Sequence, residues 1–289
     1  MARLGRRFQQ VGQKRVALSV VSFHALNRCL KPQAPARLCL FCDRRTNSPE
    51  HLWPVWARRY FERTPHDERA EGSLWVARGD QRQTTWRKRH GHTTTTTIRA
   101  VCKGCNNGWM SHLETDAKAF IEPMLIGHRV TMNRDQIQIV ASWIVLKMMV
   151  YDSETPEEAV FTRQETLEFA RNRSIPNGVM ILLCKAKERE NRAYLTRAFA
   201  NISQIRGPFR IRARIQVTTF VIGRLVVFFS LNRVKSLKLN EPSQRRAKRL
   251  WPPRGAVVSW PPDLTATEMD VANISLALRH FVQSRGLVV

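Results

Sequence analysis

Two pairs of cysteines constrain the fold of this 289-residue chain more than any other feature. Cys39 and Cys42 form one Cys-x-x-Cys pair, and Cys102 and Cys105 form another. A turn of this kind brings two sulfur atoms to one metal ion, and two turns complete the tetrahedral thiolate set of structural zinc. The spacing therefore predicts two zinc knuckles that bracket the chain between them. A redox role is a weaker interpretation, because both pairs flank a segment with metal-type side chains.

The chain around the knuckles carries a second kind of chemistry. The motif Ser-Pro-Glu-His-Leu-Trp-Pro spans residues 48–54, and Asn-Asn-Gly-Trp-Met follows the last knuckle cysteine at residues 106–110. Carboxylate, imidazole and carboxamide groups offer the oxygen and nitrogen atoms that hold a hard cation and activate a water molecule. Glu50, His51 and Asn106 are therefore the candidate catalytic residues.

The knuckles and motifs together resemble the HNH endonuclease superfamily over roughly residues 36–120. The resemblance implies an α+β fold that begins with a ββα-metal finger pinned by Zn²⁺. It also implies that His51 is the general base, and that Glu50 and Asn106 hold one catalytic Mg²⁺ or Mn²⁺ ion. His51 would then activate a water molecule against a phosphodiester bond, leaving a 5′-phosphate. A zinc-ligand role for His51, or a packed position under Trp53, is weaker because four cysteines already complete a tetrahedral site.

One position departs from the family pattern. The family's middle asparagine braces the loop that carries the histidine, and no asparagine occurs between His51 and Cys102. Its place would fall near Thr95, Thr96 or Thr97. A threonine hydroxyl can bond a backbone group but lacks the two-ended geometry of a carboxamide. The departure bears on the efficiency of cleavage more than on the fold.

The charge balance points to a polyanionic partner. The chain holds 48 lysines and arginines against 23 aspartates and glutamates, which gives a formal net charge of +25 and an isoelectric point near 11.2. Such an excess repels itself unless a polyanion neutralises it, so we expect DNA, double-stranded, with RNA as the alternative. An arginine-rich coding bias or a merely soluble surface would give the same composition.

The start of the chain and the cysteine chemistry bear on location. Residues 1–35 are basic and predict a flexible arm ahead of the finger, while a short apolar stretch at residues 16–23 gives a weaker signal-peptide interpretation. No apolar run approaches the length of a membrane-spanning helix. Reduced thiols held on zinc fit the cytoplasm, which is the expected location.

A long basic insertion separates the histidine motif from the second knuckle. Residues 57–92 are unusually long for a loop inside a compact finger. We expect either a loop that contacts the DNA backbone or a solvated loop without a partner. The candidate nucleic-acid-binding residues are Arg58, Arg59, Arg87, Lys88 and Arg89.

Local patterns place the other elements of the finger. β-branched residues predict a strand over residues 96–102 that enters the second knuckle. A helix is expected after Asn106, where apolar residues recur at helical spacing. Glu114 lies about two helical turns, roughly 12 Å, beyond Asn106. It is therefore expected to act as a cap or to pair with a basic neighbour, and not to share the same ion. The apolar stripe of this helix consists of Trp109, Leu113, Ala117 and Phe120.

Residues 121–289 predict a larger α+β domain with an antiparallel sheet and no assigned role. A strongly apolar helix is expected over residues 134–151, and the methionine-bearing stripe of this helix reads as core. Thr162 and Glu165 form a capping box that starts a second helix, which should end before Pro176. The expected strands cover residues 179–184, 194–205, 210–222 and 225–231.

The last third of the chain adds three local features. A Gly-Arg turn at residues 223–224 would form a tight hairpin between the last two strands. Alternation over residues 210–217 would put three arginines and a glutamine on one face, either for a polyanion or simply as the wet side of the sheet. Two Trp-Pro-Pro motifs, at residues 251–253 and 260–262, are expected to pack a strap onto the domain, before a final helix over residues 267–279.

These observations support three functional hypotheses. The leading one is a metal-dependent DNA endonuclease of HNH type. The alternative is a catalytically decayed zinc-knuckle protein that binds nucleic acid, and a third is an RNA-directed nuclease or toxin that uses the same site. The retained Glu50, His51 and Asn106 favour catalysis, because binding alone would not need all three. The unmatched middle asparagine and the basic charge suit the binding protein.

Overall fold

The computed structural model describes residues 37–60, 68–76, 82–90, 95–156, 159–206, 209–233 and 243–267, with the backbone alone for residues 68–76, 82–90, 188–206 and 209–214. These residues belong to one compact unit that begins at Arg37. The unit mixes helices with antiparallel sheets, which confirms the expected α+β class. The arm expected over residues 1–35 and all but the first residue of the helix expected over residues 267–279 lie outside the described residues.

The first part of the unit is a strand pair followed by helix. Strands β1 (Ser48–His51) and β4 (Thr97–Val101) are antiparallel, with Ser48 opposite Val101 and a bulge before Glu50. The chain then forms α1 (Lys103–Cys105), a π-helical turn η3 (Asn106–Met110) that is kinked at Gly108, and α2 (Ser111–Leu125). The expected strand and helix are both confirmed. Along the helix Leu113 and Ala117 are buried, and Trp109 and Phe120 pack against the core.

The basic insertion is not a loop, which corrects the expectation for residues 57–92. After a 3-10 helix η1 (Val55–Tyr60), strands β2 (Glu68–Val76) and β3 (Arg82–His90) pair in an antiparallel hairpin of nine residues each. Glu71 stands opposite Arg87 in register, and Glu68 stands opposite His90. Opposite charges across a strand pair favour pairing, so the charged composition is compatible with sheet.

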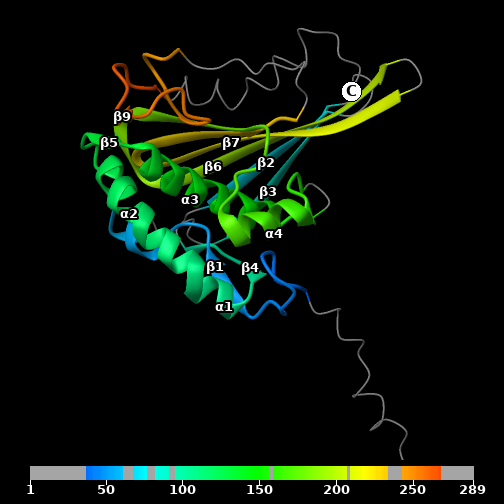
Figure 1. Ribbon diagram of the computed structural model, residues 1–289. Helices are drawn as coiled ribbons and strands as arrows, with labels where there is room; N and C mark the ends of the chain where they lie inside the picture. The colour runs from blue at the N-terminus through cyan, green and yellow to red at the C-terminus, as the bar shows by residue number, and fades with distance from the viewer. Residues whose placement is uncertain are drawn as a thin grey trace, which may run out of the picture. The chain divides into compact units, whose positions relative to one another are not determined.

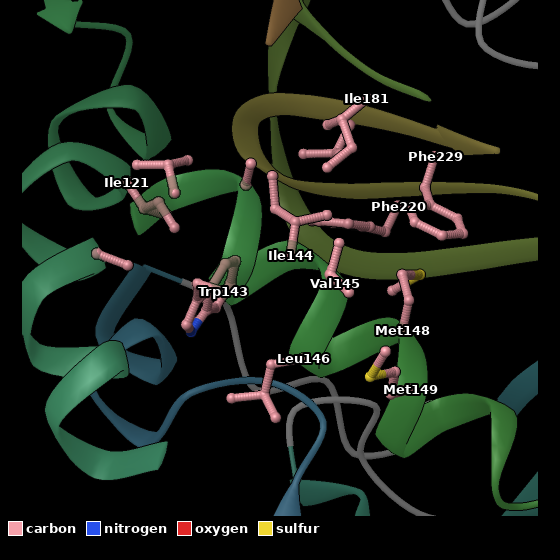
Figure 2. Packing of buried hydrophobic residues seen from close by; sticks show 14 of the residues in the cluster. Ile121, Trp143, Ile144, Val145, Leu146, Met148, Met149, Ile181, Phe220 and Phe229 are labelled. Carbon is pink, nitrogen blue, oxygen red and sulfur yellow. The ribbon is translucent and has the colours of Figure 1, made fainter. Parts of the chain in front are cut away.

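Helix α3 (Arg134–Asp152) is the centre of the core. A capping box begins it, in which Asn133 and Gln136 bond each other's backbone N–H. The helix confirms the expectation for residues 134–151, and from Val140 to Asp152 every residue is buried. Figure 2 shows its side chains between α2 on one flank and the sheet on the other; the labelled neighbours are Ile121, Ile181, Phe220 and Phe229. A helix enclosed on all sides explains why its apolar residues extend around the whole circumference.

Helix α4 (Arg163–Asn172) begins and ends where local signals place it. Thr162 accepts from the Glu165 N–H, and the Glu165 carboxylate accepts from the Thr162 N–H at 2.8 Å, which confirms the capping box. The helix ends at Arg173, which takes a left-handed conformation with φ of 61°, and Pro176 follows. Phe169 is fully buried on the inner face of the helix.

A long antiparallel hairpin forms the sheet that backs α3 (Figure 1). Strands β6 (Val179–Arg206) and β7 (Phe209–Leu231) pair along most of their length, and β8 (Lys248–Trp251) pairs with the other edge of β6. The hairpin expected at residues 223–224 is therefore wrong, because β7 runs straight through. Gly223 has φ of +58°, and a Cβ there would lie 2.4 Å from the Leu125 carbonyl oxygen. The glycine is required by a close approach of α2 and not by a turn.

The exposed face expected over residues 210–217 of β7 is also wrong where its side chains are described. Gln216 is fully buried and donates to the Thr218 hydroxyl at 2.8 Å. The three arginines expected on that face, at residues 210, 212 and 214, have side chains outside the described residues. The buried end of the face therefore belongs to the protein interior, not to a polyanion-binding surface.

The proline-rich strap packs onto the unit as expected. Trp260 ends β9 (Val258–Trp260), is buried, and donates its indole N–H to the Cys184 carbonyl at 3.2 Å. Trp251 ends β8 and packs partly buried against the core. Strand β9 pairs with β5 (Val130–Met132), which immediately precedes α3. Among the described residues, no helix is long and apolar enough to cross a membrane.

Candidate functional site

The four knuckle cysteines converge at one point. The Sγ atoms of Cys39, Cys42, Cys102 and Cys105 all lie within 4.8 Å of one another, with 3.6 Å from Cys42 to Cys102 and 3.7 Å from Cys42 to Cys105. A tetrahedron of zinc–sulfur bonds of about 2.3 Å places its sulfur atoms about 3.8 Å apart. None of the five described cysteines is in a disulfide. The cluster could therefore hold a metal such as zinc, as the spacing predicts.

The turns of the knuckles prepare the sulfur atoms for a cation. Backbone N–H groups of Phe41 and Cys105 point at the Sγ atoms of Cys39 and Cys102, at 3.5 and 3.4 Å. Burial works to raise the pKa of Cys102, but hydrogen bonds from Cys105 and the other cysteines outweigh it and lower the pKa to about 7. Burial raises the pKa of both Cys42 and Cys105. Four adjacent thiolates therefore need a bound cation to form together.

Helix α4 buttresses the first knuckle through one arginine. The guanidinium of Arg163 donates to the carbonyls of Cys39, Leu40 and Cys42 at 2.8, 2.7 and 3.0 Å. It also pairs with the Asp43 carboxylate at 3.0 Å. These contacts tie residues 120 or more positions apart, and the sequence contained no local signal for them. The first knuckle is therefore shaped by the C-terminal part of the unit.

An aromatic cluster joins the second knuckle to the same helix. Trp109, which follows the last cysteines, meets Phe41 edge-on at a centroid distance of 5.1 Å and Phe169 at 6.0 Å. Arg173 at the end of α4 lies 3.7 Å above the Trp109 ring. Such pairs add about 0.5–1.5 kcal/mol each beyond the area that they bury. Both knuckles therefore rest on one helix.

Asn106 braces the start of β1. Its Nδ2 atom donates to the Ser48 hydroxyl at 2.9 Å and to the Pro49 carbonyl at 3.2 Å. Both bonds use the amide nitrogen, so the amide oxygen is the atom that could bind a cation or a substrate group. The Asn106 backbone N–H bonds the Cys102 carbonyl, which fixes the residue directly after the cysteine cluster.

Glu50 is held inside the protein by a buried lysine. The Lys147 Nζ atom lies 2.6 Å from Glu50 Oε1, 2.8 Å from Glu114 Oε2 and 3.0 Å from the carbonyl oxygen of His51. Lys147 is 2% exposed and Glu50 7% exposed. Burial works to lower the pKa of Lys147, but the charges of Glu50 and Glu114 outweigh it and raise the pKa. Glu114 thus pairs with a basic neighbour, as expected, but the partner comes from α3.

His51 faces away from this triad. Successive residues of a strand point to opposite sides, so the buried Glu50 leaves His51 on the outer side, where it is half-buried. Burial lowers the pKa of His51 below its ordinary value of 6.5, and the charge of Arg58 adds to that effect. Glu50 and Glu114 act in the opposite direction and are outweighed. The imidazole is therefore neutral at pH 7 and able to accept a proton.

The threonines expected to replace the middle asparagine pair directly with the histidine strand. Thr97 stands opposite His51 in register, and the Thr96 carbonyl accepts from the Leu52 N–H at 3.0 Å. The histidine segment is therefore braced by backbone pairing with β4. Thr95, the third candidate position, lies just before that strand.

The basic candidates divide into two groups. Arg59 is exposed on η1 and pairs with Glu122 of α2, which also accepts from the Tyr60 hydroxyl at 2.8 Å. Arg58 lies on the same 3-10 helix, near enough to His51 to influence its pKa. The other three candidates, Arg87, Lys88 and Arg89, are on β3, and their side chains lie outside the described residues.

Sequence reasoning missed Lys147 at this site. The sequence does contain a signal for it, because Lys147 is the single charged residue between Ile137 and Tyr151 of this helix. A lysine inside a buried stripe requires an anionic partner. Comparisons of the chain with protein-family models, curated proteins and solved structures found no match. The functional argument therefore rests on the residues of this chain.

Proposed function

We propose that the chain is an HNH-type endonuclease that hydrolyses phosphodiester bonds in DNA, with His51 as the base that activates water. The observation that carries the proposal is the placement of His51. Its half-buried imidazole lies at the end of β1, opposite Thr97 and directly after the buried Glu50, and its pKa is lowered so that it is neutral at pH 7. A base with a pKa near or below the working pH is what proton abstraction requires.

The local architecture supports the proposal further. The antiparallel strands β1 and β4 and the helix that follows have the element order that the resemblance implies for a ββα-metal finger. The cysteine cluster lies at the ends of these elements, where a metal such as zinc would hold a small unit together. Asn106 supports the proposal as well, because its amide braces the start of β1 immediately before Glu50 and His51.

The exposed charge around the knuckles supports a nucleic-acid substrate. Arg37, Arg44, Arg45 and Lys103 are all exposed and lie within a few residues of the cysteines. Lysines and arginines that neutralise phosphates supply most of the sequence-independent affinity for nucleic acid. A chain with a net charge of +25 would attract a polyanion by the same interaction.

The divalent ion that the resemblance implies does not fit the Glu50 carboxylate in the contacts that this side chain makes. The carboxylate is already neutralised by Lys147 at 2.6 Å, and an ammonium beside it repels a second cation. No step of the reaction is therefore assigned to an ion at Glu50. The steps left to this chain are proton abstraction by His51 and the positioning of β1 by Asn106.

A second function has a specific observation in its favour. The same Glu50–Lys147 pair is what a structural acid would form, and it suits a zinc-knuckle protein that binds nucleic acid without cutting it. Both functions share the cysteine cluster and the exposed basic residues. They differ only in whether His51 acts on a water molecule.

Nicking of supercoiled plasmid by zinc-loaded protein separates the two functions. The reactions contain added Mg²⁺, added Mn²⁺ or no divalent ion beyond the bound zinc, with linear duplex, single-stranded DNA and RNA as further substrates. We expect nicking that His51→Ala abolishes and that His112→Ala, a matched change at an exposed histidine of α2, leaves intact. Retardation of DNA in a gel without cleavage under any condition would favour the binding function.

A further inference from the structure

We propose that Lys147 is the resident cation of this site, so that Glu50 holds an ammonium where the resemblance expects a divalent metal ion. The inference builds on the proposed function, because it concerns the acid next to His51 in the same finger. It departs from the family pattern on one point: the side chain that neutralises Glu50 belongs to the protein itself.

The ammonium of Lys147 is fully coordinated by oxygen. A lysine offers three N–H donors, and Lys147 has three acceptors within 3.0 Å: Glu50 Oε1, Glu114 Oε2 and the carbonyl oxygen of His51. The three acceptors come from two elements, β1 and α2, while Lys147 lies on α3. The ammonium thus sits among oxygen ligands of the type that a hard cation prefers.

The position is built for a charge and not for packing. Lys147 is buried between apolar neighbours on α3, where Leu146, Met148 and Met149 fill the core without polar groups (Figure 2). A methionine at residue 147 would continue that stripe, whereas a lone buried lysine would be costly to desolvate. The buried lysine is compatible with this position because the carboxylates of Glu50 and Glu114 pair with its ammonium.

Charge balance makes the lysine and a divalent ion competitors. The carboxylates of Glu50 and Glu114 share the one ammonium of Lys147. A divalent ion bound by Glu50 would lie beside the ammonium on the same carboxylate, and two cations so close repel each other strongly in a buried site. Only one of the two can neutralise Glu50 at a time.

The consequence is that Lys147 blocks a divalent site and can be removed to open it. With lysine present, Glu50 is not a ligand for Mn²⁺ or Mg²⁺. With methionine at the same position, Glu50 and Glu114 would be two closely spaced carboxylates lacking a cation, which is a donor set for these ions.

Mn²⁺ binding to the zinc-loaded, full-length protein tests the inference without nucleic acid. Free Mn²⁺ is measured by electron paramagnetic resonance for the wild type, Glu50→Gln, Lys147→Met and the double variant Lys147→Met with Glu50→Gln. We expect the wild type and Glu50→Gln to bind Mn²⁺ alike. Lys147→Met should gain a site about tenfold tighter or more, which the double variant loses. Lys118→Met, at a half-buried lysine of α2, serves as the control and should gain none.

Two results would overturn the inference. One is a wild-type Mn²⁺ site that Glu50→Gln weakens by about tenfold or more, because Glu50 would then bind the ion with Lys147 in place. The other is a folded Lys147→Met protein that gains no site. If Lys147→Met does not fold, the comparison of wild type with Glu50→Gln still decides. Because the assay contains no DNA, a protein that fails to nick plasmid can still satisfy or contradict it.

Discussion

Replacing Arg163 with alanine should loosen the first zinc knuckle by an amount that its contacts set. The guanidinium bonds three carbonyls of the knuckle, at Cys39, Leu40 and Cys42, and pairs with Asp43. Asp43 is largely exposed, with 86% of its side chain accessible, so the ion pair contributes little. The energy therefore lies in the three charge-assisted bonds to the backbone.

The magnitude follows from which carbonyls lose their donor. Hydrogen bonds to charged groups contribute about 1.5–3 kcal/mol each when buried, and less when water can replace the donor. Arg163 is 42% exposed, and Leu40 and Cys42 are only half-buried, so water can reach much of the vacated space. Cys39 is fully buried. We expect a loss of about 2 kcal/mol in the free energy of unfolding, or about 30-fold in the equilibrium constant.

Denaturant unfolding of the zinc-loaded protein measures this loss, and competition with a chromogenic chelator measures zinc retention. Arg163→Ala should release zinc more readily, and Arg163→Lys should recover less than half of the stability because one ammonium cannot bond both sides of the turn. Asp43→Ala should cost less than about 0.5 kcal/mol. The reasoning fails if Arg163→Ala costs less than about 0.5 kcal/mol, or if Asp43→Ala costs as much.

Three further predictions concern the core, the metal and the pH dependence. Phe169→Ala removes a fully buried ring from the aromatic cluster and should cost about 3–5 kcal/mol in the free energy of unfolding. Glu168→Ala, on the exposed side of the same helix, should be near neutral. A cost below about 1 kcal/mol for Phe169→Ala would contradict the packing. Loading the metal-free protein with Co²⁺ should give the visible absorption of a tetrahedral thiolate site and raise the melting temperature. Cys42→Ser should reduce the absorption and the rise in melting temperature. An unchanged melting temperature on metal removal would count against a structural role for the metal. Because burial lowers the pKa of His51, the base stays neutral to a lower pH than an ordinary histidine, so the nicking rate should fall to half its plateau only below pH 6.5. A rate already halved at pH 6.5 or above would contradict the assignment.

The parts of the fold that were predictable from sequence depend on short-range rules. The capping box at Thr162 and Glu165 and the helix over residues 134–151 each follow from spacing within a few turns. The insertion was mistaken for a loop because its strands lack apolar–polar alternation, and cross-strand charge pairs show only once the register is known. Gly223 was assigned to a turn because a glycine in sequence does not reveal whether its freedom serves a bend or the close approach of another backbone.

The candidate site was likewise predictable from the sequence only in part. By itself, the sequence determined that four cysteines share one centre, because two Cys-x-x-Cys turns have one economical way to satisfy a tetrahedral ion. It also nominated Glu50, His51 and Asn106. Only the tertiary structure decided which cation pairs with the Glu50 carboxylate. Lys147 is 97 residues away along the chain and reaches that carboxylate only when α3 packs behind β1. Buried charges are paired by whichever side chain the packing brings within about 3 Å, and packing across that separation is a property of the whole fold.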